Sequence, residues 1–329
     1  MDKKNLKQKI VRYSGILGLL VFVYIVYEVG PVHIWNNIKK VTPLHFAMLM
    51  VLRLLYWALR TINWKVILEQ YEKKTSLWEL FVARMASHTV SQLFPSAQVG
   101  GEAARIYMVN TSCKRVCIAS VIVDKTIEFM SVLLFTIITI GIIFARVTLT
   151  GKLKTLFIIA EIGFALLVFL LISKQKKGLI TWLVDFLAKL HIRPKVLEKN
   201  RDKIKETDAH IADFYLNHRT TFVKVFFLYS LLVMLWVTEV HLTLVFLGAT
   251  DISFIDSFLV TVMGNLTFMF PFIPGSLGVY EATYIAVFAA LGKSTDIAFS
   301  LVLMRRIIAL LWAVPGLFGM IKPNTGKPK

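Results

Sequence analysis

The sequence has little charge and almost no cysteine, and both shortages limit what the chain can be. Only 18% of its 329 residues are charged and 57% are apolar, a balance too hydrophobic for an ordinary soluble domain. The two cysteines, Cys113 and Cys117, lack the spacing of a redox pair or a metal site. We therefore expect a polytopic membrane protein, with no disulfide framework, no metal and no cofactor.

Long apolar runs predict the architecture. Spanning about 30 Å of hydrocarbon takes roughly 20 residues of helix. The runs of sufficient length lie near residues 13–30, 44–67, 116–145, 155–173, 222–248 and 296–320. Two further runs, 77–94 and 256–273, break at proline and return over arms too short to cross. The predicted fold is all-α, with six transmembrane helices and two re-entrant helical hairpins, 77–112 and 256–292.

The two breaks share a sequence pattern. Pro95 precedes Glu102 by seven positions, and Pro274 precedes Glu281 by the same spacing. Proline and glycine end a helix and permit a sharp reversal, and such breaks occur at membrane depth only where protein or water satisfies the backbone. The predicted hairpin-turn residues are Pro95, Gly100, Gly101, Pro274, Gly275 and Gly278.

The chain also has an internal repeat. A shift of 179 positions places the first break on the second, so residues 44–145 form one unit and residues 222–320 another. The extra span at 155–173 reverses the second unit in the membrane, which predicts inverted repeats. Substrate paths of such folds lie at the repeat interface. The alternative is that the duplicated units form a rigid scaffold.

Basic residues predict the orientation. Most lie before residue 13, in 65–115, in 174–224 and at the C-terminal end, and the positive-inside rule makes these segments cytoplasmic. The basic residues predicted to lie on the opposite side of the membrane are Lys39, Lys40, Arg146, Lys152, Lys154 and Lys293. Both termini are then cytoplasmic, and 13–30 is an uncleaved anchor. The formal charge of +18 reflects this orientation and not nucleic-acid binding. Residues 174–221 are predicted to be a basic, amphipathic loop on lipid headgroups, or else a docking surface for a partner.

Charged residues at membrane depth are the candidate site, because each is costly there and faces a cavity or a partner. Glu102 and Glu281 begin the return arms, where a carboxylate either caps the helix or contacts substrate. Arg105 either pairs with Glu102 or meets phosphate. Position 284 is tyrosine, so the second hairpin has no arginine equivalent to Arg105.

A second pair of carboxylates lies in the third span. Asp124 and Glu128 share a helix face and would repel each other unless a proton or a cation intervenes. They either serve proton coupling or amine binding, or form structural pairs with Arg305 or Arg306. Our hypothesis is that Glu102, Arg105, Asp124 and Arg305 converge on one polar cavity. The full candidate set is Arg53, Glu102, Arg105, Asp124, Glu128, Glu239, Glu281, Arg305 and Arg306.

Three segments carry a family resemblance. Residues 95–105, 124–128 and 272–281 together resemble the membrane region of lysylphosphatidylglycerol synthases and the stand-alone flippase-like proteins that share it. The resemblance covers residues 10–320 and implies lipid translocation from the inner to the outer leaflet. The soluble aminoacyl-transferase half has no counterpart here, so we expect no transferase activity. Ser276 departs from the family, which often has a second glycine at that position.

The expected function is therefore a lipid translocase of the cytoplasmic membrane. Its substrate would be a phospholipid, an aminoacyl-phospholipid or a polyprenyl-linked lipid. The alternatives are a secondary transporter of a small charged solute and a non-transporting subunit of a lipid-modifying transferase. Expected partners are membrane lipids, with a separate transferase or a second copy of the chain as further candidates. The sequence contains no catalytic triad or nucleotide-binding loop, so we do not expect an enzyme.

Overall fold

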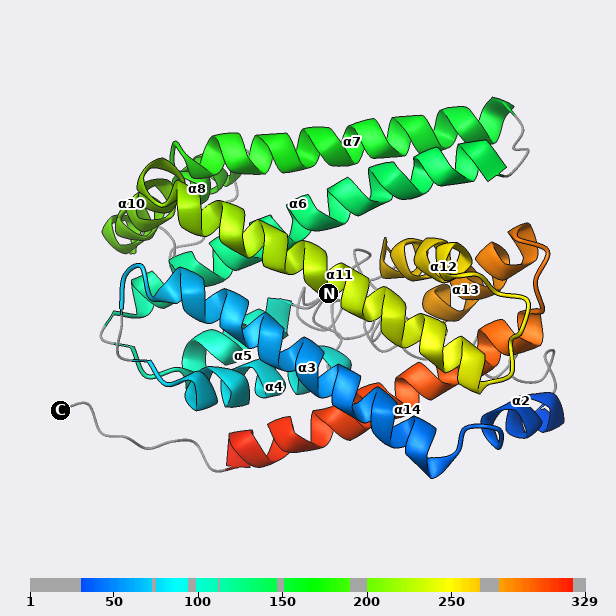
Figure 1. Ribbon diagram of the computed structural model, residues 1–329. Helices are drawn as coiled ribbons and strands as arrows, with labels where there is room; N and C mark the ends of the chain where they lie inside the picture. Colours follow the sequence, from blue (N-terminus) through cyan, green and yellow to red (C-terminus); the bar gives the residue numbers. More distant parts are fainter. Residues whose placement is uncertain are drawn as a thin grey trace, which may run out of the picture.

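The computed structural model describes residues 31–72, 75–93, 99–111, 113–146, 151–189, 200–266 and 278–321, and every regular element among them is a helix (Figure 1). The predicted anchor at 13–30 and the turn residues Pro95, Pro274 and Gly275 lie outside the described residues. The helices are α2 (Pro31–Ile38), α3 (Pro43–Leu68), α4 (Leu77–Leu93), α5 (Val99–Met108), α6 (Lys114–Arg146), α7 (Gly151–Gln175), α8 (Leu179–Lys189), α10 (Arg201–Asn217), α11 (Arg219–Phe246), α12 (Phe254–Leu266), α13 (Val279–Ala290) and α14 (Thr295–Ile321).

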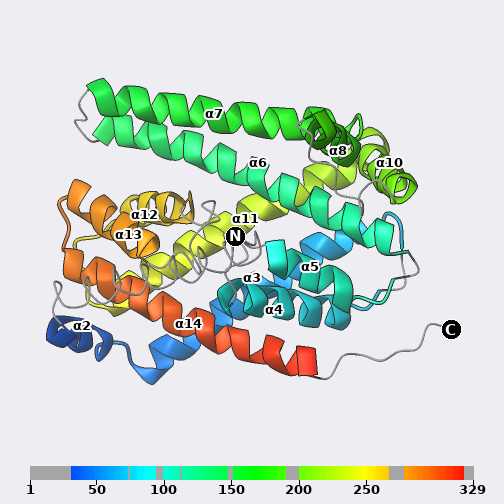
Figure 2. The ribbon, with the colours of Figure 1, turned by 180° about the vertical axis from the view of Figure 1, so that it is seen from behind.

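Five helices are long and apolar enough to cross a membrane, namely α3, α6, α7, α11 and α14. They coincide with the predicted spans at 44–67, 116–145, 155–173, 222–248 and 296–320. The breaks that were predicted at proline also separate short helices, α4 from α5 and α12 from α13. Each pair packs against itself, and the two pairs lie toward opposite ends of the long helices (Figures 1 and 2).

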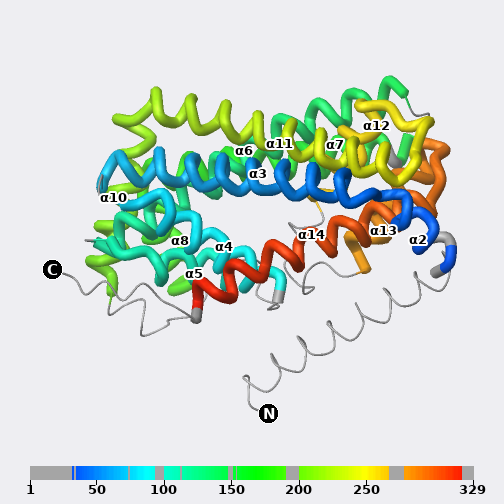
Figure 3. Tube along the Cα trace, turned by 60° about the horizontal axis from the view of Figure 1, so that its bottom comes forward, coloured from blue at the N-terminus to red at the C-terminus, as the bar shows by residue number. Residues whose placement is uncertain are grey.

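Helices from the first half of the sequence pack against helices from the second half. Helix α3 packs against α11, its counterpart under the shift of 179 positions. Helix α4 packs against α14, and the corresponding contact joins α12 to α6. Figure 2 shows these crossings from behind, and Figure 3 shows α3 running beside α11 along the length of the bundle.

Close approach between helices depends on small residues, as is common in membranes. A Cβ on Gly101 of α5 would collide with the Ser87 carbonyl oxygen of α4. A Cβ on Gly264 of α12 would collide with the Tyr284 ring of α13. The prediction that Gly100 and Gly101 form a turn is wrong, because both lie inside α5, where Gly101 permits tight helix packing. Gly278 does adopt the left-handed conformation, with φ of 80°.

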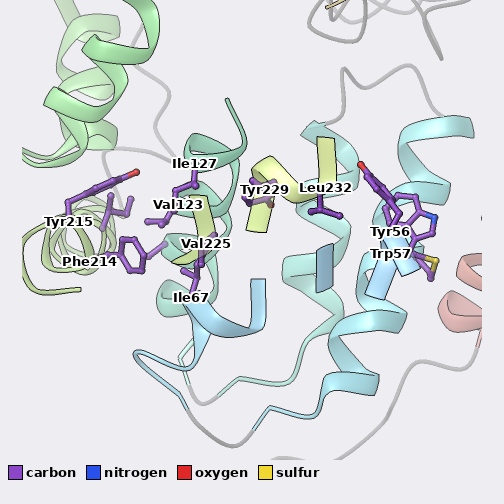
Figure 4. Packing of buried hydrophobic residues seen from close by; sticks show 13 residues of the cluster. Tyr56, Trp57, Ile67, Val123, Ile127, Phe214, Tyr215, Val225, Tyr229 and Leu232 are labelled. Atoms are coloured by element: carbon purple, nitrogen blue, oxygen red, sulfur yellow. The ribbon is translucent and has the colours of Figure 1, made fainter. Parts of the chain in front are cut away.

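The largest apolar cluster lies where α3, α6, α10 and α11 meet. Figure 4 shows Tyr56 and Trp57 at one side of this cluster, Phe214 and Tyr215 at the other, and Tyr229 between them. Because α10 supplies Phe214 and Tyr215, its inner face is part of the core. Helix α8 differs, since none of its described side chains is buried. Between α7 and α11, α10 is therefore a core helix, whereas α8 lies at the edge of the core, with Ile180 packed against the cluster.

Asp208 and Tyr71 help to hold this segment in place. The Asp208 carboxylate of α10 accepts hydrogen bonds from the backbone N–H groups of Ile180 (2.9 Å) and Thr181 (2.8 Å), which caps the start of α8. The Tyr71 hydroxyl donates to the His210 carbonyl at 2.7 Å, joining the end of α3 to α10. Burial raises the pKa of Tyr71 well above its ordinary value, so this donor stays protonated.

Candidate functional site

The first charged cluster is built around Asp124 of α6, whose side chain is fully buried. Its Oδ2 atom accepts from Arg105 of α5 at 2.8 Å and from Arg84 of α4 at 3.1 Å. Its Oδ1 atom accepts from the Tyr229 hydroxyl of α11 at 2.5 Å. One carboxylate of α6 therefore joins α4, α5 and α11. Burial without such partners would cost several kcal/mol.

Further ion pairs extend this cluster along α6. Glu102 pairs with Arg105, one turn later on α5, and with Lys125 at 3.3 Å. Lys125 also reaches Glu128 at 2.9 Å, and Glu128 accepts from Arg60 of α3 at 2.6 Å. Asp124 and Glu128 therefore each have cationic partners of their own, which offset the repulsion between the two carboxylates. The Asp124 cluster, as the term is used below, consists of Arg60, Arg84, Glu102, Arg105, Asp124, Lys125, Glu128 and Tyr229.

Trp64 of α3 packs against the two arginines that share Asp124. The Arg105 guanidinium carbon lies 4.7 Å from a Trp64 ring centroid, and that of Arg84 lies 5.3 Å away. The indole N–H donates to Ser120 of α6 at 3.0 Å, which fixes the ring. An aromatic face stabilises a guanidinium where water is excluded. Trp64 therefore helps to offset the desolvation of Arg84 and Arg105.

The second charged cluster joins α3, α11, α13 and α14. Arg53 of α3 pairs with buried Glu239 of α11. Arg306 of α14 donates to Glu281 Oε1 at 2.5 Å, while Glu281 Oε2 accepts from the Gly278 backbone N–H at 2.7 Å. Glu281 thus caps α13, as one of its two expected roles requires, and also holds Arg306.

Arg305 of α14 has different surroundings. It is buried, and its Nη1 donates to the Tyr284 hydroxyl at 2.7 Å. Its guanidinium carbon lies 4.8 Å from a Trp236 ring centroid and 5.8 Å from that of Tyr280. Within the described part of the chain no carboxylate lies within ion-pairing distance of Arg305. The Arg305 cluster, as the term is used below, consists of Arg53, Trp236, Glu239, Tyr280, Glu281, Tyr284, Arg305 and Arg306.

The two clusters meet at Tyr56 of α3. Its hydroxyl accepts from Arg60 of the first cluster at 2.7 Å. The guanidinium carbon of Arg53 lies 5.4 Å from the Tyr56 ring centroid, and the Trp236 ring centroid lies 5.9 Å from it. Charged and aromatic side chains therefore form a continuous series from Asp124 to Arg305 through the middle of the bundle.

The structure brings together most, but not all, of the residues that we expected to meet. Glu102, Arg105 and Asp124 do converge, whereas Arg305 belongs to the second cluster. The alternative pairing of Asp124 or Glu128 with Arg305 or Arg306 is wrong, because α3, α4, α5 and α6 itself supply the cations. These cations are closer in the sequence to Asp124 and Glu128 than Arg305 and Arg306 are.

The second hairpin was expected to lack the arginine that Arg105 provides in the first. That expectation holds for α13 itself, but α14 supplies the missing guanidinium through Arg306. Seven members of the two clusters were not among the candidates from the sequence: Arg60, Arg84, Lys125, Tyr229, Trp236, Tyr280 and Tyr284. Arg84 had a detectable signal, because it is a charge in the interior of an apolar arm whose other charged residue, Glu79, lies in the first turn. The tyrosines had none, since phenols are ordinary residues in such helices.

Among the described residues, no group of three or more histidine, cysteine, aspartate or glutamate side chains could hold a metal ion. The site is a set of ion pairs, hydroxyls and aromatic faces. Such a site can bind charged or hydrogen-bonding groups reversibly at membrane depth.

These features define a class: a multi-pass helical membrane protein with charged side chains buried between its spans. The chain belongs to the family described as the lysylphosphatidylglycerol synthase TM region, whose model matches residues 10–316. The resemblance seen in the sequence is thereby confirmed.

Curated relatives agree with this assignment. A UPF0104 membrane protein of Methanothermobacter thermautotrophicus is 23% identical over 91% of this chain and 90% of its own length. A UPF0104 membrane protein of Pyrococcus horikoshii is 27% identical over 87% of this chain and 90% of its own length. Both names describe membrane proteins and neither names an enzymatic activity. No solved structure matches the chain.

Proposed function

We propose that this protein is a lipid translocase that moves a phosphate-containing lipid between the leaflets of the cytoplasmic membrane. The observation that carries the proposal is the series of charged side chains from Asp124 to Arg305. It crosses from helices of the first half to helices of the second. Ionisable groups inside membrane spans are rare and commonly mark substrate pathways.

The exchange of helix contacts supports an inverted-repeat arrangement. The pairs α4 with α14 and α12 with α6 are equivalent under the shift of 179 positions, and α3 packs against its own counterpart α11. In this proposal the two short-helix pairs are re-entrant hairpins, 13–30 is the sixth span, and both termini are cytoplasmic. Rocking of one repeat against the other would expose the charged series to each leaflet in turn.

The family supports a lipid substrate. Its description names a synthase of a modified phospholipid, and the match covers the membrane region alone. A guanidinium next to hydroxyl donors suits a phosphate group, because arginine binds phosphate through charge-assisted hydrogen bonds. The exposed apolar faces of the spans give acyl chains a place to remain in the bilayer while the headgroup crosses.

Reconstitution in liposomes tests the proposal. Vesicles would carry phosphatidylglycerol with a fluorescent acyl chain in both leaflets, and dithionite would bleach the outer leaflet. We expect protein-containing vesicles to bleach beyond the outer-leaflet fraction, and Arg305→Gln to slow this second phase. An Arg146→Gln protein, altered in a half-exposed pair outside both clusters, is the control. Bleaching identical to that of protein-free vesicles, for all lipids tried, would favour transport of a small solute.

A further inference from the structure

Whether the two clusters can bind a positively charged headgroup depends on whether any of their carboxylates lacks a cationic partner. In the Asp124 cluster, each carboxylate is paired with two cations: Glu102 with Arg105 and Lys125, Asp124 with Arg84 and Arg105, and Glu128 with Arg60 and Lys125. In the Arg305 cluster, Glu239 holds Arg53 and Glu281 holds Arg306. No carboxylate of the two clusters is therefore left for an ammonium group brought in by a substrate.

The three arginines of the Arg305 cluster differ in whether they have a carboxylate partner. Arg53 and Arg306 each have a carboxylate partner, whereas Arg305 has none within the residues that the structure describes. A buried guanidinium without a counter-ion is costly, and proteins keep such groups where a ligand supplies the missing charge. The second cluster thus lacks one negative charge at Arg305.

The groups around Arg305 also favour an acceptor ligand. The Tyr284 hydroxyl accepts from Arg305 at 2.7 Å and from the Tyr280 hydroxyl at 3.1 Å. The hydrogen bond between the two phenols uses only one of their two protons. A guanidinium and a phenol that both offer protons suit a phosphate oxygen, which accepts from each. Trp236 covers the guanidinium and limits access by water.

We propose that the headgroup accepted by this protein carries net negative charge, with its phosphate on Arg305, and that aminoacylated, cationic headgroups are excluded. The inference rests on the proposed lipid translocation and specifies its substrate class. It separates this chain from the lipid that gives the family its description, because a lysyl group adds ammonium charge for which neither cluster offers a carboxylate.

Two lipids make a matched test. Phosphatidylglycerol and lysylphosphatidylglycerol with the same acyl chains share the phosphodiester and differ by the lysyl group. Each would be added to detergent-purified protein, and the lipid retained after size-exclusion chromatography would be measured by mass spectrometry. We expect phosphatidylglycerol to be retained at least about tenfold more strongly, the size of one charge-assisted hydrogen bond.

Variants assign the preference to Arg305. Arg305→Gln should reduce phosphatidylglycerol retention to the level of lysylphosphatidylglycerol, while Arg305→Lys should keep part of the preference, because it keeps the charge without the planar donors. Arg146→Gln should retain both lipids as the parent protein does. Monodisperse elution of each variant shows that the fold survives. Inorganic phosphate at the same concentration should not displace the lipid.

Several results would overturn the inference. They are equal or stronger retention of lysylphosphatidylglycerol, retention of neither lipid, unchanged retention by Arg305→Gln, and displacement by inorganic phosphate, which would assign the site to a water-soluble anion. The inference fails separately from the proposed function. Selective binding of phosphatidylglycerol without movement in liposomes would contradict the proposed translocase function but support the anion site. Movement of lysylphosphatidylglycerol alone would support the translocase function but contradict the anion site.

Discussion

The two charged clusters use the same kinds of residue in the same membrane core, yet they are connected very differently. In the Asp124 cluster every carboxylate has two cationic partners, and Tyr229 of α11 adds a hydrogen bond. In the Arg305 cluster each carboxylate has one arginine, and a third arginine has only hydroxyl and aromatic neighbours. The difference indicates a division of labour: the first cluster holds helices together, and the second keeps a cation for substrate.

A single substitution between the repeats explains much of this difference. The shift of 179 positions aligns Glu102 with Glu281, but Arg105 with Tyr284. Arg105 lies on the same helix, α5, as Glu102. On α13 the equivalent position is Tyr284, and the arginines come from α14 instead. Arg306 pairs with Glu281, and Arg305 donates to the Tyr284 hydroxyl.

The largest effect should come from Asp124→Asn. The change removes the charge that Arg84 and Arg105 share in a fully buried position, so the unfolding free energy should fall by about 3–5 kcal/mol. The measurement is the thermal unfolding midpoint in detergent. Asp185→Asn is the control, because its pair with Arg201 is exposed and should contribute only ~0–1 kcal/mol. Equal midpoints for the two variants would break the comparison.

A smaller effect should follow from filling the glycine contacts of the hairpins. Gly101→Ala pushes a methyl group onto the Ser87 carbonyl oxygen, which cannot move aside, and should cost about 1–3 kcal/mol. Gly264→Ala instead displaces the Tyr284 ring, so it should also weaken anion retention. Gly141→Ala meets nothing and serves as the control. A Gly101→Ala protein with reduced anion retention and normal stability would reverse the assigned roles.

The smallest loss should come from Tyr229→Phe. It removes one donor to Asp124 and leaves both arginines in place, so the unfolding free energy should fall by about 1 kcal/mol. The same unfolding assay measures it. A double variant with Asp124→Asn should lose less than the sum of the two changes, because both act on one hydrogen-bonded carboxylate. Strict additivity would place Tyr229 outside the cluster.

Much of the fold could be predicted from the sequence, because a long apolar run in a membrane protein predicts a spanning helix. Helices α3, α6, α7, α11 and α14 each lie within a few residues of the predicted spans. The grouping of Glu102 with Arg105 also followed from helical spacing. The partners of Asp124 did not, because which helices cross at membrane depth depends on packing at residues such as Gly101, whose role is invisible in hydropathy. Arg305 was recognised as costly, but its distance from carboxylates required the structure.

The most direct test of the division between the clusters is a paired measurement on Arg305→Gln. Removing a buried cation that has no carboxylate partner should leave the thermal unfolding midpoint unchanged or raise it, while phosphatidylglycerol retention falls at least about tenfold. The opposite pattern, a lowered midpoint with phosphatidylglycerol retained as in the parent protein, would make Arg305 a structural residue and contradict the account.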